Sequence, residues 1–381
     1  MNISKLYNNF TKLNLLLLLL FSSNVISQNG LGYYTDHNNA FIVFEKGKTY
    51  TLERTDVDSI RVGDNYLAYV DAIGNMKVFY NGQTNEVENT FPNQIIAAST
   101  MLVYKMQNRL MVVDNGVKKQ LTNWTSNFWV AEELVVWIDQ PSFDLKAYCN
   151  GEIYTIEKSA DTKTIKEFKI GRNIFAYNDL NNHLKVFYNG QVYDSKTSNI
   201  HKFKCGKNTM AYYDEFYNEF KVFHKGEFTT ICSFNPKEYE VSDDQVVYID
   251  INDYFMVYYN KETTKLLSYH PNYYKTINSL VFYNYLMEYF VFYKGKIVSL
   301  EKFIPKKNVI MGYNSILYLD NNNRIKYFHD GTIYESFIIE KIKTKKLKRD
   351  LPMFYYANNS IAFFYDGKLY EYTSIKINNK H

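Results

Sequence analysis

A short run that ends in a tight turn recurs ten times along this chain, and no other feature constrains the fold as strongly. The heptapeptide KVFYNGQ itself occurs at 77–83 and again at 185–191. The last residues of the ten turns lie 34 to 39 residues apart, mostly 35 or 36. Ten copies at a nearly fixed period indicate a repeat architecture in which each copy is one supersecondary unit. The copies are IVFEKG (42–47), KVFYNG (77–82), MVVDNG (111–116), KAYCNG (146–151), KVFYNG (185–190), KVFHKG (221–226), MVYYNK (256–261), FVFYKG (290–295), KYFHDG (326–331) and AFFYDG (362–367).

A second motif precedes each turn, as in VGDNYLAYVD (62–71) and CGKNTMAYYD (205–214). Its aromatic residue is present in all ten copies: Tyr34, Tyr69, Tyr104, Trp137, Tyr177, Tyr212, Tyr248, Phe282, Tyr318 and Phe354. An Asp follows two residues later in seven copies: Asp36, Asp71, Asp139, Asp179, Asp214, Asp250 and Asp320. Seven carboxylates at one loop position could ring a face of the protein. We expect them instead to accept backbone N–H bonds and to stabilise the loop, because Asp favours such local bonds.

Each unit is expected to be a meander of four antiparallel strands. In the copy at 201–232 these strands are predicted at 201–205, 209–214, 219–224 and 227–232. Gly206-Lys207-Asn208 joins the first two strands, and Lys225-Gly226 joins the last two. Asn-Gly, Asp-Gly and Lys-Gly pairs between alternating apolar runs are typical of tight hairpins, because such turns need positive φ angles. The 37 Tyr and 27 Phe also favour strands.

The third strand indicates how these sheets pack. Counting back from the last turn residue, the sixth position is apolar or aromatic in every copy and the fourth is Val or Ala in eight. The third position, on the opposite face, is aromatic in nine copies. A two-layer sandwich would leave one face of each sheet in water. Sheets that are apolar on both faces need a neighbour on each side, and the radial stacking of a β-propeller supplies it.

The combined pattern G-x-N-x-φ-φ-A-Y-x-D, a polar loop, and K-V-F-Y-x-G resembles the blades of TolB-like propellers. The likeness covers about 25 residues of each unit. It departs from that family where Gly-x-Asn replaces the usual Asp-Gly turn, and where the period is shorter than the ~40–45 residues of typical blades.

The phase of the repeat predicts a closed ring. The first copy begins at its second strand, near Leu31, and an extra segment at 374–378 follows the last copy. We expect this segment to complete the first blade and to close one ring of about ten blades, which removes exposed sheet edges. Two five-bladed halves are the alternative, although no linker rich in Pro, Gly or Ser marks a boundary.

Residues 1–27 are predicted to be a secretory signal, which leaves 28–381 as the propeller domain. Lys5 and Lys12 precede the apolar run 15–21, which is too short to span a bilayer, and 25–27 suits a cleavage site. The alternative is a buried N-terminal element. No later stretch is apolar and long enough to span a membrane. The mature protein is expected to be a monomer in the periplasm, on the cell surface or secreted.

Charge and cysteine content exclude several classes of function. Without Lys5 and Lys12 the chain has 42 basic and 40 acidic residues, a balance that argues against a general electrostatic grip on nucleic acid. Cys149, Cys205 and Cys232 are too few and odd in number for a disulfide framework. We expect no cofactor and no metal site.

Two deviations from the repeat are candidate binding sites. Trp124 and Trp129 fall in NWTSNFW, between two copies, and could stack on sugars or fill a pocket of a partner; core packing is the alternative. A basic run without acids could bind an anionic polymer such as an acidic glycan, and a lysine-protected edge or loop is the alternative. Its members are Lys341, Lys343, Lys345, Lys346, Lys348 and Arg349.

The sequence favours an exported interaction module that binds a protein or glycan partner through its loops. None of the seven His forms a zinc-protease motif, and the chain has no G-x-S-x-G elbow and no P-loop. The alternative is an envelope hydrolase or lyase with its site in the central channel. Polar side chains that converge from non-equivalent repeat positions would favour the enzyme, whereas a funnel lined by equivalent positions would favour the module.

Overall fold

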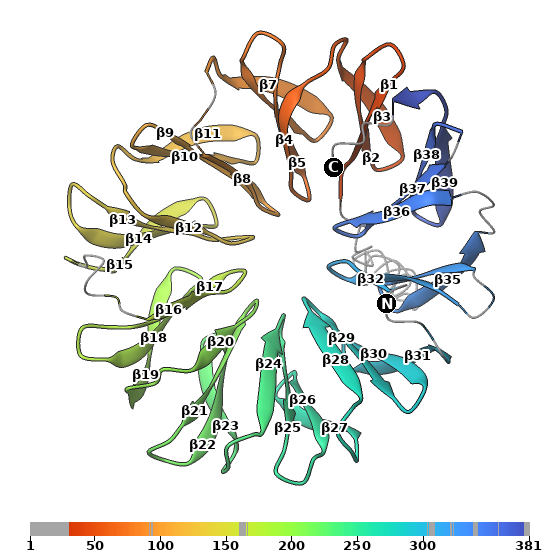
Figure 1. The fold of residues 1–381 in the computed structure, drawn as a ribbon. Helices are drawn as coiled ribbons and strands as arrows, with labels where there is room; N and C mark the ends of the chain where they lie inside the picture. The colour runs from red at the N-terminus through yellow and green to blue at the C-terminus, as the bar shows by residue number, and fades with distance from the viewer. Residues whose placement is uncertain are drawn as a thin grey trace, which may run out of the picture.

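The repeats fold into one ring of ten blades, each a four-stranded antiparallel sheet (Figure 1). The structure is a computed structural model. It describes residues 30–376 with the exception of 91, 93, 160–164, 166, 303, 305–308, 321, 323, 338–341 and 357. The predicted all-β propeller is therefore confirmed, and the ten blades form a single ring rather than two five-bladed halves. The predicted signal segment 1–27 lies outside the described residues.

Each blade contributes one strand to each of four positions, numbered here by their order across the sheet. The first strands are β40 (Ile375–Lys376) in blade 1, then β4 (Asp58–Val62), β8 (Gln94–Ala97), β12 (Phe128–Val130), β16 (Phe168–Ile170), β20 (Phe203–Cys205), β24 (Glu238–Ser242), β28 (Tyr273–Ile277), β32 (Ile310–Met311) and β36 (Ile342–Lys348) in blades 2 to 10. The second strands are β1 (Gly32–Asp36), β5 (Tyr66–Val70), β9 (Met101–Met106), β13 (Val135–Asp139), β17 (Ile174–Asn178), β21 (Thr209–Asp214), β25 (Gln245–Ile249), β29 (Leu280–Tyr285), β33 (Ser315–Leu319) and β37 (Leu351–Tyr356).

The third and fourth strands complete the blades toward the outside of the ring. The third strands are β2 (Phe41–Glu45), β6 (Met76–Tyr80), β10 (Arg109–Asp114), β14 (Asp144–Cys149), β18 (His183–Tyr188), β22 (Glu219–His224), β26 (Phe255–Tyr259), β30 (Glu288–Tyr293), β34 (Ile325–His329) and β38 (Ser360–Tyr365). The fourth strands are β3 (Lys48–Glu53), β7 (Gln83–Glu88), β11 (Val117–Thr122), β15 (Glu152–Glu157), β19 (Gln191–Ser198), β23 (Glu227–Cys232), β27 (Glu262–Leu267), β31 (Lys296–Lys302), β35 (Thr332–Phe337) and β39 (Lys368–Tyr372).

The C-terminal strand closes the ring, as the phase of the repeat predicts. β40 pairs with β1 at Thr35↔Lys376 and Asp36↔Ile375. Blade 1 is thus built from both ends of the described chain. Ile375 is buried against the core between blades 10 and 1. Closure removes the two open sheet edges that an incomplete ring would expose.

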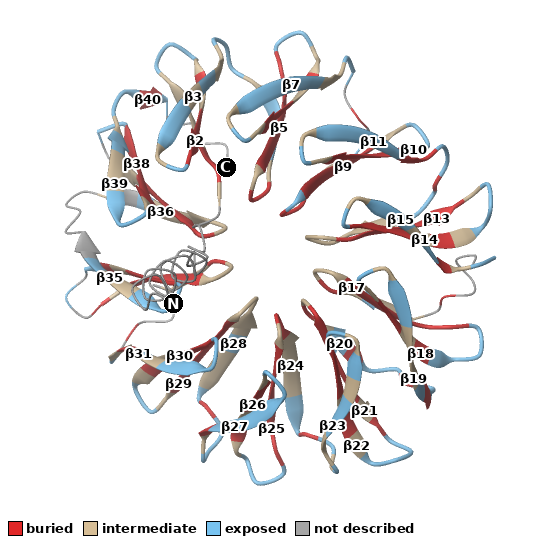
Figure 2. Ribbon diagram, turned by 180° about the vertical axis from the view of Figure 1, so that it is seen from behind, coloured by how far each residue is buried: buried red, intermediate tan, exposed pale blue. Residues whose placement is uncertain are grey.

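Both faces of each blade are buried against neighbours, which explains the apolar pattern of the third strand. On β6, Phe79 packs with Leu67 and Tyr69 against blade 1, and Val78 on the other face packs against Tyr104 of blade 3. Figure 2 shows buried residues along the second and third strands of the blades, while the fourth strands are largely exposed. Full burial of a side chain such as Phe79 contributes about 1.5–3 kcal/mol to folding.

The hairpin between the third and fourth strands has the geometry that its sequence predicts. In KVFYNGQ, Asn81 and Gly82 have φ angles of 48° and 76°, and Tyr80 pairs with Gln83. Two successive positive φ angles define a turn whose twist matches the flanking strands.

The Asp that ends the second strand stabilises the outer loop, which we define as the loop between the second and third strands of a blade. Oδ1 of Asp179 accepts N–H bonds from Asn181 and His183, both at 2.9 Å. Its Oδ2 pairs with Lys185 Nζ at 2.9 Å. Asp71 makes the same contacts with the backbone of Ile73 and Asn75 and with Lys77. The structural interpretation of this Asp is therefore confirmed.

Within the described part of the chain, no helix has the length and apolar character needed to cross a membrane.

Candidate functional site in the central channel

The inner turns, which join the first and second strands of a blade, point to the centre of the ring (Figure 1). The residue that follows the Gly of Gly-x-Asn, or its equivalent, is called here the first turn residue. It occupies one position in blades 2 to 10, and its chemistry varies from blade to blade. The nine residues are Asp64, Ser99, Glu132, Arg172, Lys207, Asp243, Asn278, Tyr313 and Arg349. At the centre of the ring the copies of the repeat therefore differ in charge.

Arg349 joins side chains from widely separated blades. Its Nη1 lies 2.8 Å from Oε1 of Glu132, and its Nε lies 2.9 Å from Oδ1 of Asp64. Ser99 donates a hydrogen bond of 2.5 Å to Oε2 of Glu132, and the Tyr313 hydroxyl donates to Oε1. Blades 2, 3, 4, 9 and 10 are thereby connected across the channel.

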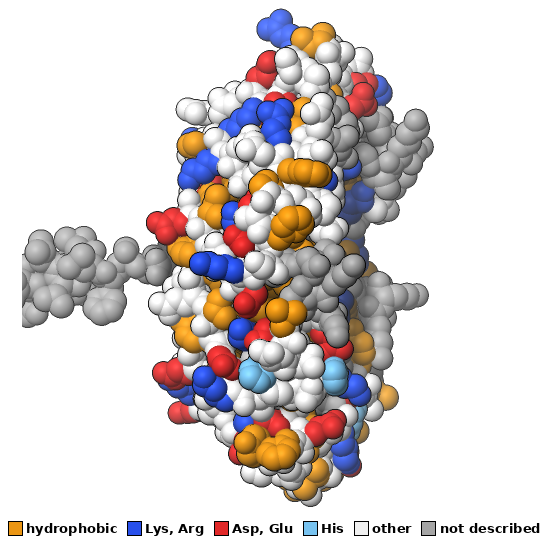
Figure 3. All heavy atoms as spheres, turned by 90° about the vertical axis from the view of Figure 1, so that its left-hand side faces the viewer, with side chains coloured by type: hydrophobic (Ala, Val, Ile, Leu, Met, Phe, Trp, Pro, Cys, Tyr) orange, Lys and Arg blue, Asp and Glu red, His pale blue; other side chains and the backbone are white. Residues whose placement is uncertain are grey.

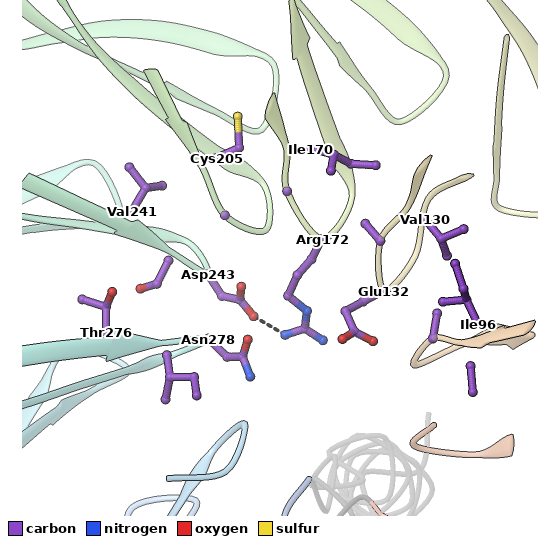
Figure 4. A pocket seen from close by; sticks show the side chains of 17 residues that line it. Ile96, Val130, Glu132, Ile170, Arg172, Cys205, Val241, Asp243, Thr276 and Asn278 are labelled. Atoms are coloured by element: carbon purple, nitrogen blue, oxygen red, sulfur yellow. Dashed lines mark hydrogen bonds and ion pairs between the residues drawn. The ribbon is translucent and has the colours of Figure 1, made fainter. Parts of the chain in front are cut away.

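A second group of ion pairs continues this network. Arg172 pairs with Asp243, and Lys207 Nζ lies 2.5 Å from Glu133 Oε1. The guanidinium groups of Arg172 and Arg349 lie over the ring of Tyr313, with Cζ-to-centroid distances of 5.1 and 4.2 Å. Cation–π contacts of this kind favour a fixed ring orientation. Figure 4 shows Arg172 between Asp243 and Glu132.

Burial changes the acidity of several carboxyl groups in the channel. Burial raises the pKa of Asp64 and the pKa of Asp243, although the guanidinium beside each carboxylate opposes the rise. Burial also raises the pKa of Asp350, the second residue of an inner turn, to about 6. The Asp350 carboxylate accepts bonds of 2.7 Å from the Asn314 amide and the Ser315 hydroxyl.

Adjacent inner turns touch through their backbones. The Arg172 amide donates to the Gly206 carbonyl at 3.1 Å, and the Glu133 amide donates to the Arg172 carbonyl at 2.9 Å. A Cβ atom on Gly206 would lie 2.2 Å from the Ser242 carbonyl oxygen, and one on Gly171 would lie 2.2 Å from the Gly206 carbonyl oxygen. Gly in the Gly-x-Asn motif therefore permits this close approach between blades.

A pocket of about 470 Å³ lies beside the ion-pair network, between the inner ends of blades 3 to 8. One repeat position, the residue two before the first turn residue, forms its walls: Ala97, Val130, Ile170, Cys205, Val241 and Thr276. Glu132, Arg172, Asp243 and Asn278 line its polar side (Figure 4). The pocket thus combines small or branched side chains with fixed charges.

The two tryptophans singled out by sequence lie in different environments. Trp124, in the connection between β11 and β12, is 53% exposed, and its carbonyl accepts from the Gln140 amide at 3.1 Å. Trp129 was expected in the same connection, but it lies on β12. It is half-buried, with its ring centroid 4.7 Å from that of Phe168 on blade 5. The expectation failed because β12 has three residues and is hard to recognise from its pattern.

The basic run forms the strand that borders the channel in blade 10. Lys341 lies outside the described residues, and Lys343 belongs to β36. Lys346 and Lys348 lie over the rings of Tyr355 and Tyr33, at 5.5 and 5.8 Å from the centroids.

Burial lowers the pKa of Lys345 and of Lys348, which also faces the charge of Lys346. Arg349 is already paired with Asp64 and Glu132. The run therefore separates into one residue of the channel network and several partly desolvated lysines.

Ile73, in the outer loop of blade 2, is 83% exposed. Exposed apolar side chains also recur at the outer loops of five successive blades, 4 to 8. They are 52–87% exposed and comprise Phe143, Leu180, Phe216, Tyr217, Ile251, Leu286 and Met287. Figure 3 looks onto the edge of the disc and shows apolar side chains interspersed with charged ones. This apolar exposure recurs in the same loop of neighbouring blades, although not at one position of that loop, and it makes the outer loops a candidate interaction surface.

The described residues contain no group of three or more His, Cys, Asp or Glu side chains that could hold a metal ion. Burial raises the pKa of the Cys205 thiol in the pocket wall to about 12, which disfavours the nucleophilic thiolate form. The carboxylates of the channel are engaged by guanidinium, ammonium and hydroxyl groups. The arrangement is suited to holding the inner turns together and to binding.

A family model described as "10-bladed beta propeller domain" matches residues 25–370. The chain belongs to this family. A search of curated protein sequences gives no match.

Solved structures similar to this 10-bladed propeller have low sequence identity and low TM-scores. The computationally designed Ika8 protein is 13% identical, with 79% of this chain and 99% of that chain covered and a TM-score of 0.30. The tricorn protease is 9% identical, with 90% and 47% covered and a TM-score of 0.30. PorZ of Porphyromonas gingivalis, a surface component of the type-IX secretion system, is 8% identical, with 91% and 60% covered and a TM-score of 0.23.

Sequence reasoning missed most of the channel site of this 10-bladed propeller. Glu132, Arg172, Asp243 and Tyr313 were not recognised as candidates, and Arg349 was grouped with the lysines beside it. One signal could have found them. The residue after the Gly of Gly-x-Asn, as in Gly63-Asp64 and Gly171-Arg172, varies in charge while its neighbours are constrained.

Proposed function

We propose that this 10-bladed propeller is an exported, non-enzymatic interaction module that binds a protein partner through its outer loops. The observation that carries this proposal is the arc of exposed apolar side chains on blades 4 to 8, which includes Phe143, Leu180, Phe216 and Ile251. Large apolar side chains on loops lose solvent contact when a partner covers them, and this loss favours association.

The channel supports a module over the alternative, an envelope hydrolase or lyase. Most of its polar side chains come from one equivalent position of the repeat, the pattern expected of a module. Arg349 and Arg172 are paired with carboxylates of other blades. Groups held in such pairs stabilise a fixed geometry rather than supply a free acid and a free base.

The chemistry of the arc favours a protein partner over a glycan. Leu180, Ile251, Leu286 and Met287 have no ring to stack on a sugar and match the apolar contacts of protein interfaces. Trp124 and the lysines of β36 remain the residues through which a glycan would be bound in the alternative.

Export is part of this proposal. It rests on the predicted signal at 1–27, and it would place the mature protein in the periplasm, on the cell surface or outside the cell. A relationship to TolB-like blades is also part of the proposal, because this relationship rests on the repeat pattern of the sequence.

Affinity capture from the envelope of the native organism tests the proposal. The wild type is compared by quantitative mass spectrometry with the variant Phe143→Ser/Leu180→Ser/Phe216→Ser/Ile251→Ser. We expect at least one envelope protein to be enriched by the wild type and lost with this variant, and to bind the purified wild type directly.

A matched control carries four exposed apolar residues of the fourth strands, Val117→Ser/Ile153→Ser/Val192→Ser/Ile297→Ser. It should retain the partner. A partner that is lost with the control but retained by the outer-loop variant would contradict the proposal. A glycan array with wild type and Trp124→Ala examines the alternative partner class.

A further inference from the structure

We infer that the channel pocket between blades 3 and 8 is a binding site for a small neutral saccharide of one or two sugar rings. This site is separate from the outer loops and does not depend on the proposed protein partner. Its volume of about 470 Å³ is in the range of small-ligand sites, ~300–1,000 Å³.

The walls of the pocket supply apolar contact on one side of a ligand. Val130, Ile170 and Val241 occupy one repeat position on the first strands of blades 4, 5 and 7, and all line the pocket. Packing between blades holds these strands in place, so the wall is preformed. A sugar ring presents C–H groups that can lie against such a surface.

The opposite side supplies hydrogen-bonding groups that are held in position by ion pairs. Arg172 pairs with Asp243 and lies over the Tyr313 ring, and Glu132 is held by Arg349, Ser99 and Tyr313. The side chains of Arg172 and Glu132 are still 20% and 22% exposed. A guanidinium has five N–H donors and a carboxylate about four acceptor sites, so both groups retain capacity for a ligand.

The charges that line the pocket select against charged ligands. One guanidinium, on Arg172, lies between the carboxylates of Asp243 and Glu132 (Figure 4). An anionic ligand would lie near both carboxylates. A cationic ligand would compete with Arg172 for Asp243. The hydroxyl groups of a neutral sugar can instead accept hydrogen bonds from the guanidinium and donate hydrogen bonds to the carboxylates. The amide of Asn278 adds a further hydrogen-bonding group.

Calorimetric titration with matched sugars tests the inference. Glucose, glucuronate and glucosamine share one ring but differ in charge, as do galactose, galacturonate and galactosamine, and neutral disaccharides extend the set. We expect saturable binding of at least one neutral sugar, at least about tenfold tighter than its charged counterparts, a difference of about 1.4 kcal/mol.

Two pocket variants and one control locate the site. Thr276→Leu should narrow the pocket and weaken binding, and Asn278→Ala should weaken binding several-fold. Val62→Leu enlarges a residue at the same repeat position in blade 2, outside the pocket, and should bind as the wild type does. The outer-loop variant should also bind sugar normally, which separates failure of this inference from failure of the proposed function.

Three results would overturn the inference: no saturable binding of any neutral sugar, tighter binding of a uronate than of its neutral counterpart, or unchanged binding by Thr276→Leu. Circular dichroism and thermal melting establish that each variant is folded. If Asn278→Ala does not fold, Thr276→Leu, which leaves the polar side intact, decides the outcome.

Discussion

Arg349, a single residue of one repeat, contacts side chains from three other blades of the ring. Its side chain is 14% exposed and joins Asp64 of blade 2 to Glu132 of blade 4, and its guanidinium also lies over the Tyr313 ring of blade 9. Without this partner, Asp64 would be a nearly buried carboxylate whose main neutralising contact had been removed. The free energy of unfolding should therefore depend strongly on one turn residue.

Replacing Arg349 by Met should destabilise the protein by about 2–4 kcal/mol, close to the ~3–5 kcal/mol seen when one partner of a buried ion pair is removed. Urea denaturation followed by fluorescence measures this change. Arg54→Met, at an exposed position, should stay within about 0.5 kcal/mol of the wild type. Equal stability of the two variants would show that the network does not hold the channel together.

Asp350 should make stability depend on pH. Burial raises its pKa to about 6, whereas an Asp in the unfolded chain titrates near ~3.9. The folded protein therefore binds the proton more tightly. The resulting stability is fully present below about pH 4 and is lost as the pH rises through about 6, up to about 3 kcal/mol in all.

Asp350→Asn cannot ionise, so its stability relative to the wild type should rise between about pH 4 and pH 7. Urea denaturation of both proteins across this range measures the difference, with Asp58→Asn as an exposed control. A difference that stays constant, or that falls with pH, would contradict the assignment.

At the scale of the blade, the Asp at the end of the second strand and the Lys on the third strand stabilise the outer loop together. Asp179 holds the outer loop through the amides of Asn181 and His183 and fixes Lys185 beside it. Because bonds to a charged acceptor contribute about 1.5–3 kcal/mol, Asp179→Ala should destabilise the protein by about 2 kcal/mol.

Asp179→Asn keeps the Oδ1 acceptor and loses the charge, so it should lose less than half as much stability as Asp179→Ala. Hydrogen exchange offers a local readout. The amides of Asn181 and His183 should lose protection in the Ala variant and largely keep it in the Asn variant. Equal losses in the two variants would mean that the ion pair with Lys185, not the loop bonds, carries the effect.

The second, third and fourth strands could be predicted from sequence because their signals are local. Asn81-Gly82 requires positive φ angles, and Val78 and Phe79 show by their alternation that both faces are buried. The channel could not be predicted in this way. Tyr313 and Glu132 are 181 residues apart in sequence, and Arg349 and Glu132 are 217 apart. Their meeting depends on how the ring closes, which no local pattern encodes.

For the molecule as a whole, closure depends on a very short contact between the ends of the chain. β40 contributes two residues. Their pairing with Thr35 and Asp36 completes the sheet of blade 1. The cross-channel pairs of Arg349 also connect blade 10 with blades 2 and 4. The ring is therefore held at its rim by β40 and at its centre by ion pairs, and the two should reinforce each other.

Ile375→Ala tests the rim contact. Ile375 is 3% exposed and packs in the core between blades 10 and 1, and truncation of a buried Ile to Ala costs about 2–5 kcal/mol. Lys376→Ala is the matched control, since Lys376 is exposed and pairs with Asp56 at the surface, where such pairs contribute about 0–1 kcal/mol. Small-angle scattering should show a larger radius of gyration for Ile375→Ala at temperatures where the wild type and Lys376→Ala keep theirs. Because both contacts hold the same closure, each single change already loses the stabilisation that the two contacts share. Ile375→Ala combined with Arg349→Met should therefore lower stability by less than the sum of the single changes. Strict additivity would indicate instead that the rim and the channel stabilise the ring independently.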